Sequence, residues 1–430
     1  MVSSSITPVL LSVAVYLCAA GAVNPGFVVR LTQMGLDYAR QQGMTVLQQE
    51  LAKVHLPDFS GSAHSPVGKV KYHFDSMKIR NFQLPNSQIS PMPGVGLKLS
   101  ISGGFIEIDG RWHVKALHIS TKGGFNLKVE GISISVGLKV GSDTSGRPTI
   151  ALSDCSNHIS DVKIHVSGKL SWLVDLFRHN VDNALRKAIE NQICPLVSNS
   201  ITSKLEPLLQ TLKVTAKIDN VAAIDYSLTG PPPVTTDCVD VQLKGEFFEL
   251  SHRTPPPFSP PALKLPSDHS LMVYFGVSDY LFNTAGFVYY TAGKLIFNIT
   301  DNMIPKDFSI RLNTSSFGVL IPQTTTALAK VAVKSGWIVG NLELSRVLMD
   351  LKHSDVGPFS VVILNTAVNY YLSKVILPQV NQILNKGYPL PLLDNVQLTD
   401  VVLQPQQDFL LFGANIHYGK TLNSTWIDRY

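Results

Sequence analysis

The chain has 430 residues, of which 45% are hydrophobic and only 16% are charged, and its mean hydropathy is +0.15. Such a composition excludes a disordered chain, and the length predicts two domains rather than one continuous core. The formal net charge is +5, but the basic residues form no Arg-rich runs with stacked aromatic residues, so we expect no nucleic-acid partner.

The first apolar stretch, ITPVLLSVAVYLCAAGA, occupies residues 6–22 and is short for a helix that crosses a membrane. It ends in Ala20-Gly21-Ala22, a pattern of small residues that is typical of a signal peptidase site. We therefore interpret residues 1–22 as a secretory signal peptide and expect a secreted, extracellular protein.

A helical pattern follows from Phe27 to Val54, weakened at Gly43. Its first turns place four side chains on one face: Phe27, Leu31, Met34 and Tyr38. Residues 67–168 then alternate apolar and polar positions between Gly and Pro residues, which predicts a meander of strands. A long helix is expected next, interrupted near Pro195, and a strand pair closes this half. The apolar stripe of that helix is formed by Leu173, Phe177, Val181, Leu185, Ala188 and Ile189.

Residues 231–262 are rich in proline, which favours extended polyproline II structure and predicts a semi-rigid linker. Residues 263–430 repeat the order of the first half: a helix over 278–293, strands, a long helix broken at Pro378, and two terminal strands. The repetition predicts an α+β fold in which residues 23–230 and 263–430 each form a curved antiparallel sheet with a long helix packed on it. Only 65 residues separate the helices of the second half, against 120 in the first, so the second sheet should lack several strands.

Positive charge is concentrated in residues 61–170, which hold 13 Lys and Arg against seven Asp and Glu, whereas the rest of the chain has a net charge of −1. Within this region the stretch GRWHVKALHISTKGG, residues 110–124, contains no acidic residue and predicts a basic hairpin. A neighbouring predicted loop, GKVKYHF, adds two lysines. Such side chains are either simply solvated or face an anionic partner, and a lipid or glycan suits a secreted protein best.

Catalytic motifs are missing from the sequence, which has no GxSxG turn, no HExxH helix and no nucleotide-binding glycine loop. Ser133 lies within a continuous alternating run rather than at a strand-to-helix turn, and no Cys/His cluster has the spacing of zinc ligands. We therefore expect a monomeric binding protein without a metal or a catalytic cofactor. A lipid hydrolase is the remote alternative.

Three cysteines follow the predicted signal peptide, namely Cys155, Cys194 and Cys238. In an oxidising compartment this odd number suggests one disulfide and one remaining thiol, and spacing alone does not choose the pair. Sequons mark three candidate glycosylation sites, at Asn298, Asn313 and Asn423.

Five segments resemble the family of bactericidal permeability-increasing protein and lipopolysaccharide-binding protein. They are VNPGFVVRLTQMGLDYARQQG, NFQLPNSQIS, PPPFSPP, SDYLFNTAG and VVLQPQQDFLLFGANIHY, and the resemblance covers nearly all of the chain after residue 22. It implies an elongated boomerang of two barrels joined by a central sheet, to which residues 231–262 contribute, with an apolar phospholipid pocket in each half. Bound phospholipid is therefore expected.

The resemblance also implies a site for the lipid A part of bacterial lipopolysaccharide, on the surface of the Gram-negative outer membrane, at the tip of the N-terminal barrel. The matching tip residues are Lys69, Lys71, Arg111, His113, Lys115 and Lys122. The expected lining of the N-terminal lipid pocket is Phe27, Leu31, Met34, Tyr38, Leu173 and Phe177. The family's disulfide falls on Cys155 and Cys194, which leaves Cys238 free.

This implies an innate-immune protein with an antibacterial, endotoxin-neutralising effect. The alternative is transfer of lipopolysaccharide or phospholipid to a receptor or lipoprotein, which the sequence does not separate from the first function. Two features depart from the family. The chain has His113, Ala116, Leu117 and Ser120 where the family has a dense basic run, so endotoxin affinity should be weaker, or rise at acidic pH when His113 and His118 become charged. Roughly 50 residues are missing near Gln323-Thr324, which shortens the second barrel and can expose a sheet edge.

Overall fold

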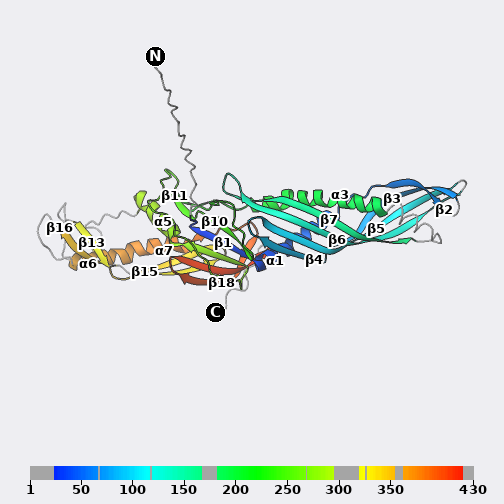
Figure 1. Cartoon of the computed structure of the whole chain (residues 1–430). Coiled ribbons are helices and arrows are strands. Elements are labelled where there is room, and N and C mark those ends of the chain that lie inside the picture. Colours follow the sequence, from blue (N-terminus) through cyan, green and yellow to red (C-terminus); the bar gives the residue numbers. More distant parts are fainter. Residues whose placement is uncertain are drawn as a thin grey trace, which may run out of the picture.

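The computed structural model describes residues 24–65, 68–116, 119–166, 182–267, 269–294, 319–324, 327–353 and 362–419. Figure 1 shows an elongated molecule whose two halves extend in opposite directions from a central sheet. The predicted α+β class and the two halves joined by a central sheet are confirmed. The predicted signal peptide and the three sequons lie outside the described residues.

Five strands form the central sheet in the order β10, β1, β12, β19, β18, and every neighbouring pair is antiparallel. Their bounds are β1 Phe27–Thr32, β10 Cys238–Leu243, β12 Val273–Ser278, β18 Val396–Gln406 and β19 Phe409–Tyr418. Strand β1 thus pairs with β12 of the second half on one side and with β10 on the other. Strand β10 lies within residues 231–262, the stretch predicted as a Pro-rich linker and part of the central sheet.

The helix predicted from Phe27 begins only at Gln33, as α1 (Gln33–Leu51), and it runs through Gly43 without a break. The preceding residues form β1, which has a strand on each side and buried or half-buried side chains throughout. A strand that is covered in this way lacks the alternation that separates a strand from a helix in a sequence. The hydroxyl of Thr32 accepts a hydrogen bond from the N–H of Gly35 at 3.4 Å and caps the helix.

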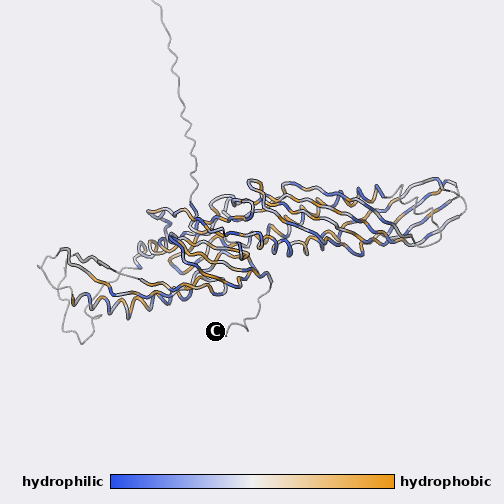
Figure 2. Tube along the Cα trace, turned by 60° about the horizontal axis from the view of Figure 1, so that its bottom comes forward, coloured by the Kyte–Doolittle hydropathy of each residue, from blue (hydrophilic) through white to orange (hydrophobic). Residues whose placement is uncertain are grey.

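The meander predicted for residues 67–168 is confirmed as a six-stranded antiparallel sheet in which β4 pairs only with β5. Apolar and polar residues alternate along its strands (Figure 2). The strands are β2 Phe59–Ser65, β3 Gly68–Gln83, β4 Asn86–Met92, β5 Gly96–Ala116, β6 Ile119–Ser142 and β7 Pro148–Val166.

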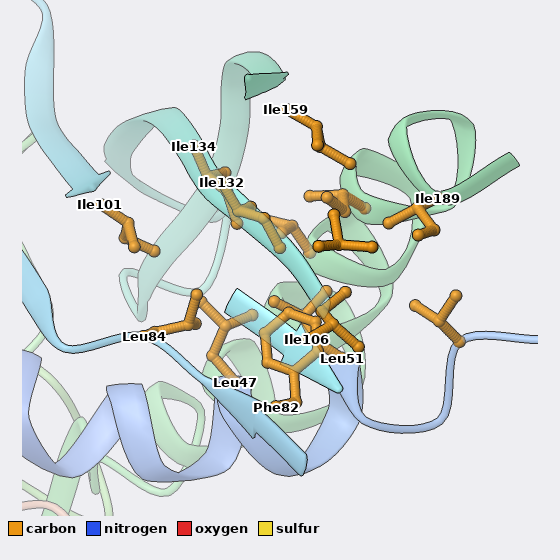
Figure 3. Close-up of a cluster of buried hydrophobic side chains, with 14 of the residues drawn as sticks. Leu47, Leu51, Phe82, Leu84, Ile101, Ile106, Ile132, Ile134, Ile159 and Ile189 are labelled. Carbon is orange, nitrogen blue, oxygen red and sulfur yellow. The ribbon is translucent and has the colours of Figure 1, made fainter. Parts of the chain in front are cut away.

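The core of the first half lies between this sheet and two helices (Figure 3). Leu47 and Leu51 reach into it from α1, Ile189 reaches into it from the long helix α3, and Ile106 and Ile132 reach into it from the sheet. All five side chains are buried. Each contributes about 1.5–3 kcal/mol through removal of apolar surface from water.

Neither long helix ends at a proline, so the predicted interruptions at Pro195 and Pro378 are wrong. The segments are α3 Asp182–Ser200, η1 Ile201–Leu205 and α4 Glu206–Leu209 in the first half, and α6 Val362–Tyr371, η3 Leu372–Ile376 and α7 Leu377–Lys386 in the second. Pro195 lies inside α3 beside Cys194, whose disulfide ties the helix to β7.

A π-helical turn precedes a proline in both long helices. The N–H of Glu206 donates to the carbonyl of Ile201, one residue before Pro207. In the second half the N–H of Leu377 donates to Leu372 one residue before Pro378. In a regular α-helix the proline ring clashes with the carbonyl four residues earlier. The wider π-helical turn moves that carbonyl away from the ring, so the helix continues past the proline. Pro207, rather than Pro195, is therefore the counterpart of Pro378.

In the second half α5 (Asp279–Thr291) follows β12, which confirms the helix predicted over 278–293. Besides β12, β18 and β19 in the central sheet, the described strands of this half form two small sheets, β13 with β16 and β14 with β15 and β17; a third small sheet, β11-β9-β8, lies beside the centre. The bounds are β8 Thr215–Lys217, β9 Ala222–Asp225, β11 Glu246–Glu249, β13 Val319–Thr324, β14 Ala327–Lys334, β15 Trp337–Leu344, β16 Leu348–His353 and β17 Tyr388–Pro389. Among the described residues, no helix combines the length and the apolar character needed to cross a membrane.

Candidate functional site

Two hairpins meet at the end of the first half that lies far from the central sheet (Figure 1). The predicted basic hairpin is formed by β5 and β6, in which Ala116 lies opposite Ile119. The second hairpin joins β2 to β3, and β3 pairs with β5 so that Val70 lies opposite Ala116. Lys69 and Lys71 therefore lie on strand β3, not in the loop that the sequence predicts.

Strand alternation sorts the tip side chains between two faces. Trp112 and Val114 point into the core and are buried. The ring N–H of Trp112 donates to the carbonyl of Gly124 at 3.2 Å, and a Cβ on Gly123 would lie only 2.6 Å from the ring. The opposite face carries all six predicted tip residues, which are exposed: Lys69, Lys71, Arg111, His113, Lys115 and Lys122.

Four of these residues form what we call the lysine patch: Lys69, Lys71, Lys115 and Lys122. The register places Lys71 directly opposite Lys115, and Lys122 opposite His113. Like charges at opposed positions of two strands destabilise a sheet. No carboxylate in the described part of the chain forms an ion pair with the four ammonium groups. The patch therefore holds uncompensated positive charge on one exposed face.

The other two predicted residues surround a carboxylate that the sequence reasoning missed. Asp75 lies opposite Arg111, and its Oδ1 is 3.5 Å from the Arg111 Nε. Its Oδ2 is 3.0 Å from Nδ1 of His113 and 3.6 Å from Nε2 of His73. A hydrogen bond from the Ser76 hydroxyl, together with these bases, lowers the pKa of Asp75. Arg111 and His113 thus share a counter-charge that the lysines do not have.

The predicted lining of the lipid pocket is not brought together on one helix face. Phe27 is on β1, fully buried, with its ring 5.6 Å from that of Tyr226. Leu31 is also on β1, whereas Met34 on α1 is 45% exposed. The Tyr38 hydroxyl accepts a hydrogen bond from the N–H of Tyr418 at 2.8 Å. The prediction of a shared helix face is wrong because that face spans the end of a strand; Leu173 and Phe177 lie outside the described residues.

The disulfide between Cys155 and Cys194 is confirmed and joins β7 to α3. Cys238 is free, as predicted, and burial raises the pKa of its thiol. Among the described residues, no group of three His, Cys, Asp or Glu side chains could hold a metal ion. His118, which the sequence analysis also named, lies outside the described residues.

The N-terminal domain model of the LBP / BPI / CETP family matches residues 35–210, and its C-terminal domain model matches residues 216–334 and 323–418. The lipopolysaccharide-binding protein of Homo sapiens is 39% identical over 457 aligned positions, which cover 93% of this chain and 95% of that protein. The bactericidal permeability-increasing protein of Rattus norvegicus is 36% identical, with 92% of this chain and 94% of that protein covered.

A crystal structure of lipopolysaccharide binding protein superposes with a TM-score of 0.73 at 37% identity, covering 92% of this chain and all of the solved one. The alignment with the human protein is longer than the 430 residues of this chain, so that relative has residues that this chain lacks. The chain belongs to the LBP / BPI / CETP family.

Proposed function

We propose that this protein binds the lipid A part of bacterial lipopolysaccharide at the lysine patch, on the Gram-negative outer-membrane surface, with an antibacterial, endotoxin-neutralising effect. The observation that carries the proposal is the register of β3 and β5, which sets Lys71 against Lys115 on an exposed face. A phosphate group between them would offset a repulsion that the described residues do not compensate. Relatives of similar length are named lipopolysaccharide-binding protein.

The charges and the acyl chains have separate tasks in this proposal. Each lysine near an anionic surface contributes about 1 kcal/mol. Four lysines together therefore give only about millimolar affinity. Burial of an acyl chain contributes about 0.8 kcal/mol per methylene. The lysine patch therefore selects the anionic target and speeds encounter, and acyl burial supplies retention.

The test compares vesicles that contain lipid A with vesicles of neutral phosphatidylcholine, at low and at high salt. The variant Lys71→Glu with Lys115→Glu reverses charge on two opposed, exposed side chains. We expect binding to lipid A to fall by at least about tenfold, because two favourable charges become unfavourable, with unchanged thermal stability.

The matched control is Lys98→Glu with Lys139→Glu. These exposed lysines lie on β5 and β6 as well, but near the central sheet rather than at the tip. If the control variant lost as much binding, the loss would be due to the net charge of the protein and not to the lysine patch. Equal, salt-insensitive binding of the natural chain to both kinds of vesicle would contradict the proposal and favour a general lipid carrier.

We also propose that the protein is secreted after removal of residues 1–22, that it carries phospholipid and that it binds lipid without hydrolysing it. The disulfide is typical of an oxidising compartment. Amino-terminal sequencing of the protein from culture medium tests the cleavage after Ala22. Mass spectrometry of a lipid extract of the purified chain tests for intact phospholipid, and recovery of free fatty acid or lysolipid instead would indicate hydrolysis.

A further inference from the structure

We propose that His73, His113 and Asp75 form an acid-strengthened phosphate subsite next to the lysine patch, which makes binding at the tip tighter as pH falls from 7.5 to 5.5. This inference rests on the proposed function, since it concerns the same face. It adds His73 and Asp75 to the binding residues. It also assigns them a task that differs from that of the lysines.

The geometry brings two imidazoles onto one carboxylate oxygen. His73 lies opposite His113 in the register of β3 and β5, and the ring centroids are 6.3 Å apart. Both rings reach Oδ2 of Asp75, at 3.6 and 3.0 Å. The other ring nitrogen of His73, Nδ1, lies 2.6 Å from the hydroxyl oxygen of Ser60 on β2. The two imidazole side chains are each 46% exposed, so a ligand can reach them.

The charges around the rings come from all four strands of the tip. On β3 and β5 these are Lys71, Asp75, Arg111 and Lys115, and on β6 Lys122 lies opposite His113. On β2 the titratable neighbour is His64, opposite Lys69. Asp75 is the acidic group among them. When both imidazoles are neutral, Asp75 balances Arg111 and the cluster adds no net charge to the lysine patch.

Protonation changes this balance in two ways. Each imidazole that gains a proton adds a positive charge to the face, and imidazole titrates in the range between pH 5 and 8. Protonated rings also form ion pairs with Asp75, and this weakens the attraction between Asp75 and Arg111. The guanidinium of Arg111 is then available for the paired hydrogen bonds that it makes with phosphate oxygens. Asp75 stays ionised in this range, because the Ser76 hydroxyl and the neighbouring bases lower its pKa.

The sign of the effect follows from linkage. A phosphate bound beside the rings favours their protonated form, so binding takes up protons and affinity rises as pH falls. Two added charges correspond to an increase of affinity of about tenfold or more.

The first experiment measures binding of the full chain to phosphatidylglycerol vesicles at pH 7.5 and 5.5, at equal ionic strength. A phosphodiester keeps its charge across this range, so only the protein titrates. We expect binding to be about tenfold tighter at pH 5.5. Affinity that is equal at both pH values would overturn the proposal.

Three variants assign the effect to the cluster. His73→Gln with His113→Gln should bind at pH 5.5 about as tightly as it does at pH 7.5, so that most of the pH dependence is lost. Asp75→Asn should bind severalfold more tightly at pH 7.5, because Arg111 is freed without protonation. The matched control His158→Gln removes an exposed imidazole of β7 that lies near Glu190, away from the tip, and should behave as the natural chain does.

If the double histidine variant kept the full pH dependence, the effect would belong to His64 or His118 and the proposal would be wrong. If the double variant melts at a lower temperature than the natural chain, the single variant His113→Gln is used instead. It should lose about half of the change in the logarithm of the affinity between pH 7.5 and 5.5. A parallel series on lipid A vesicles compares the two phosphate classes: we expect a smaller increase there, because the phosphate monoester of lipid A itself gains a proton across this range. Binding to lipid A that weakened at pH 5.5 in the double histidine variant alone would separate this ligand effect from the effect of the rings. Absence of a preference for lipid A at pH 7.5 would refute the proposed function while the phosphatidylglycerol series still tests the subsite.

Discussion

In the first half, the long helix α3 lies on a six-stranded sheet and buries an apolar stripe that includes Leu185, Ile189 and Ile193. In the second half, the long helix runs through α6, η3 and α7, and it has a π-helical turn before Pro378 as the first long helix has one before Pro207. No side chain of α7 is fully buried; Leu384 packs against the core, and Asn381 bonds to the backbone of β15. Among the described residues, the sheet beside α7 has three strands, against six in the first half.

A short sheet offers too little apolar surface to hold a long helix, and amide side chains supply part of the contact in its place. Asn381 accepts from the N–H of Leu342 at 2.7 Å and donates to its carbonyl at 2.9 Å. Asn369 does the same with Val347, at 2.7 Å for both bonds. Each amide thus occupies the position of a neighbouring strand. In the described part of the second half, these directional hydrogen bonds add to the burial of apolar side chains such as Ile338 and Tyr388.

The disulfide should give the largest difference between the halves, because residues 263–430 contain no cysteine. Replacement of Cys155 and Cys194 by serine opens a loop of 39 residues. We expect the first half to lose about 4 kcal/mol of unfolding free energy on the chain-entropy estimate. Urea unfolding followed by hydrogen exchange in each half checks this, and an equal loss in the second half would mean that the halves unfold as one unit.

A pair of identical substitutions compares the helices directly. Ile189→Ala in α3 empties a fully buried position and should lower the free energy of unfolding by about 3 kcal/mol. Ile383→Ala in α7 changes a residue that is 41% exposed and should cost less than about 1 kcal/mol. Similar losses at the two positions would show that the apolar face of α7 is covered after all.

The amide contact of the second half can be broken by Asn381→Leu. Because the N–H and the carbonyl of Leu342 lose their partner, we expect a loss of about 2 kcal/mol, confined to β14, β15 and α7. Gln382→Leu, at the exposed neighbouring position, is the control and should leave stability unchanged. Hydrogen exchange at the Leu342 amide is the measurement. If the Leu342 amide were protected from exchange as well in Asn381→Leu as in the natural chain, Asn381 would not be what holds α7 to β15.

The smallest expected effect concerns cross-strand ion pairs, which occur in both halves. Glu130 pairs across the strands with Lys163 and along its own strand with Lys128, and these lysines lower its pKa to about 2; in the second half Glu343 pairs across the strands with Lys330. Because the pKa of Glu130 is lowered, its contribution to stability is present above the ordinary glutamate pKa and is lost as pH falls toward 2. Glu130→Gln should therefore lower the melting temperature slightly at pH 7 and not at pH 2. A pH-independent difference would show that charge is not the cause.

The sequence predicts the parts of the fold that rest on local patterns. Alternation between Gly and Pro residues correctly places the long strands of the first half, and the resemblance correctly pairs Cys155 with Cys194. Strand β1 is missed because it is covered by strands on both sides, and the continuous helices are missed because a π-helical turn leaves no mark in hydrophobic periodicity.

At the tip, too, local sequence patterns predict some features and miss others. The exposure of the six basic residues follows from charge and alternation, but the two facing lysines and the shared Asp75 depend on register. Register here shifts at a bulge between Asp75 and Lys78, where Ser76 has a φ of 56°. No local pattern gives that shift. The spacing of Lys69, Lys71, His73 and Asp75 at every second residue is the signal that could have placed His73 on the tip face.

The pairing of β1 with β12 has a consequence for biosynthesis. Val29 lies opposite Phe275, so the first strand of the central sheet gains its neighbour on this side only after roughly 240 further residues have been made, which takes about 12–50 s at ordinary rates of translation. During that time the nascent first half exposes an unpaired edge at its base. A ribosome that stalls in the Pro-rich stretch would prolong this exposure, and the chain would depend on folding helpers until β12 emerges.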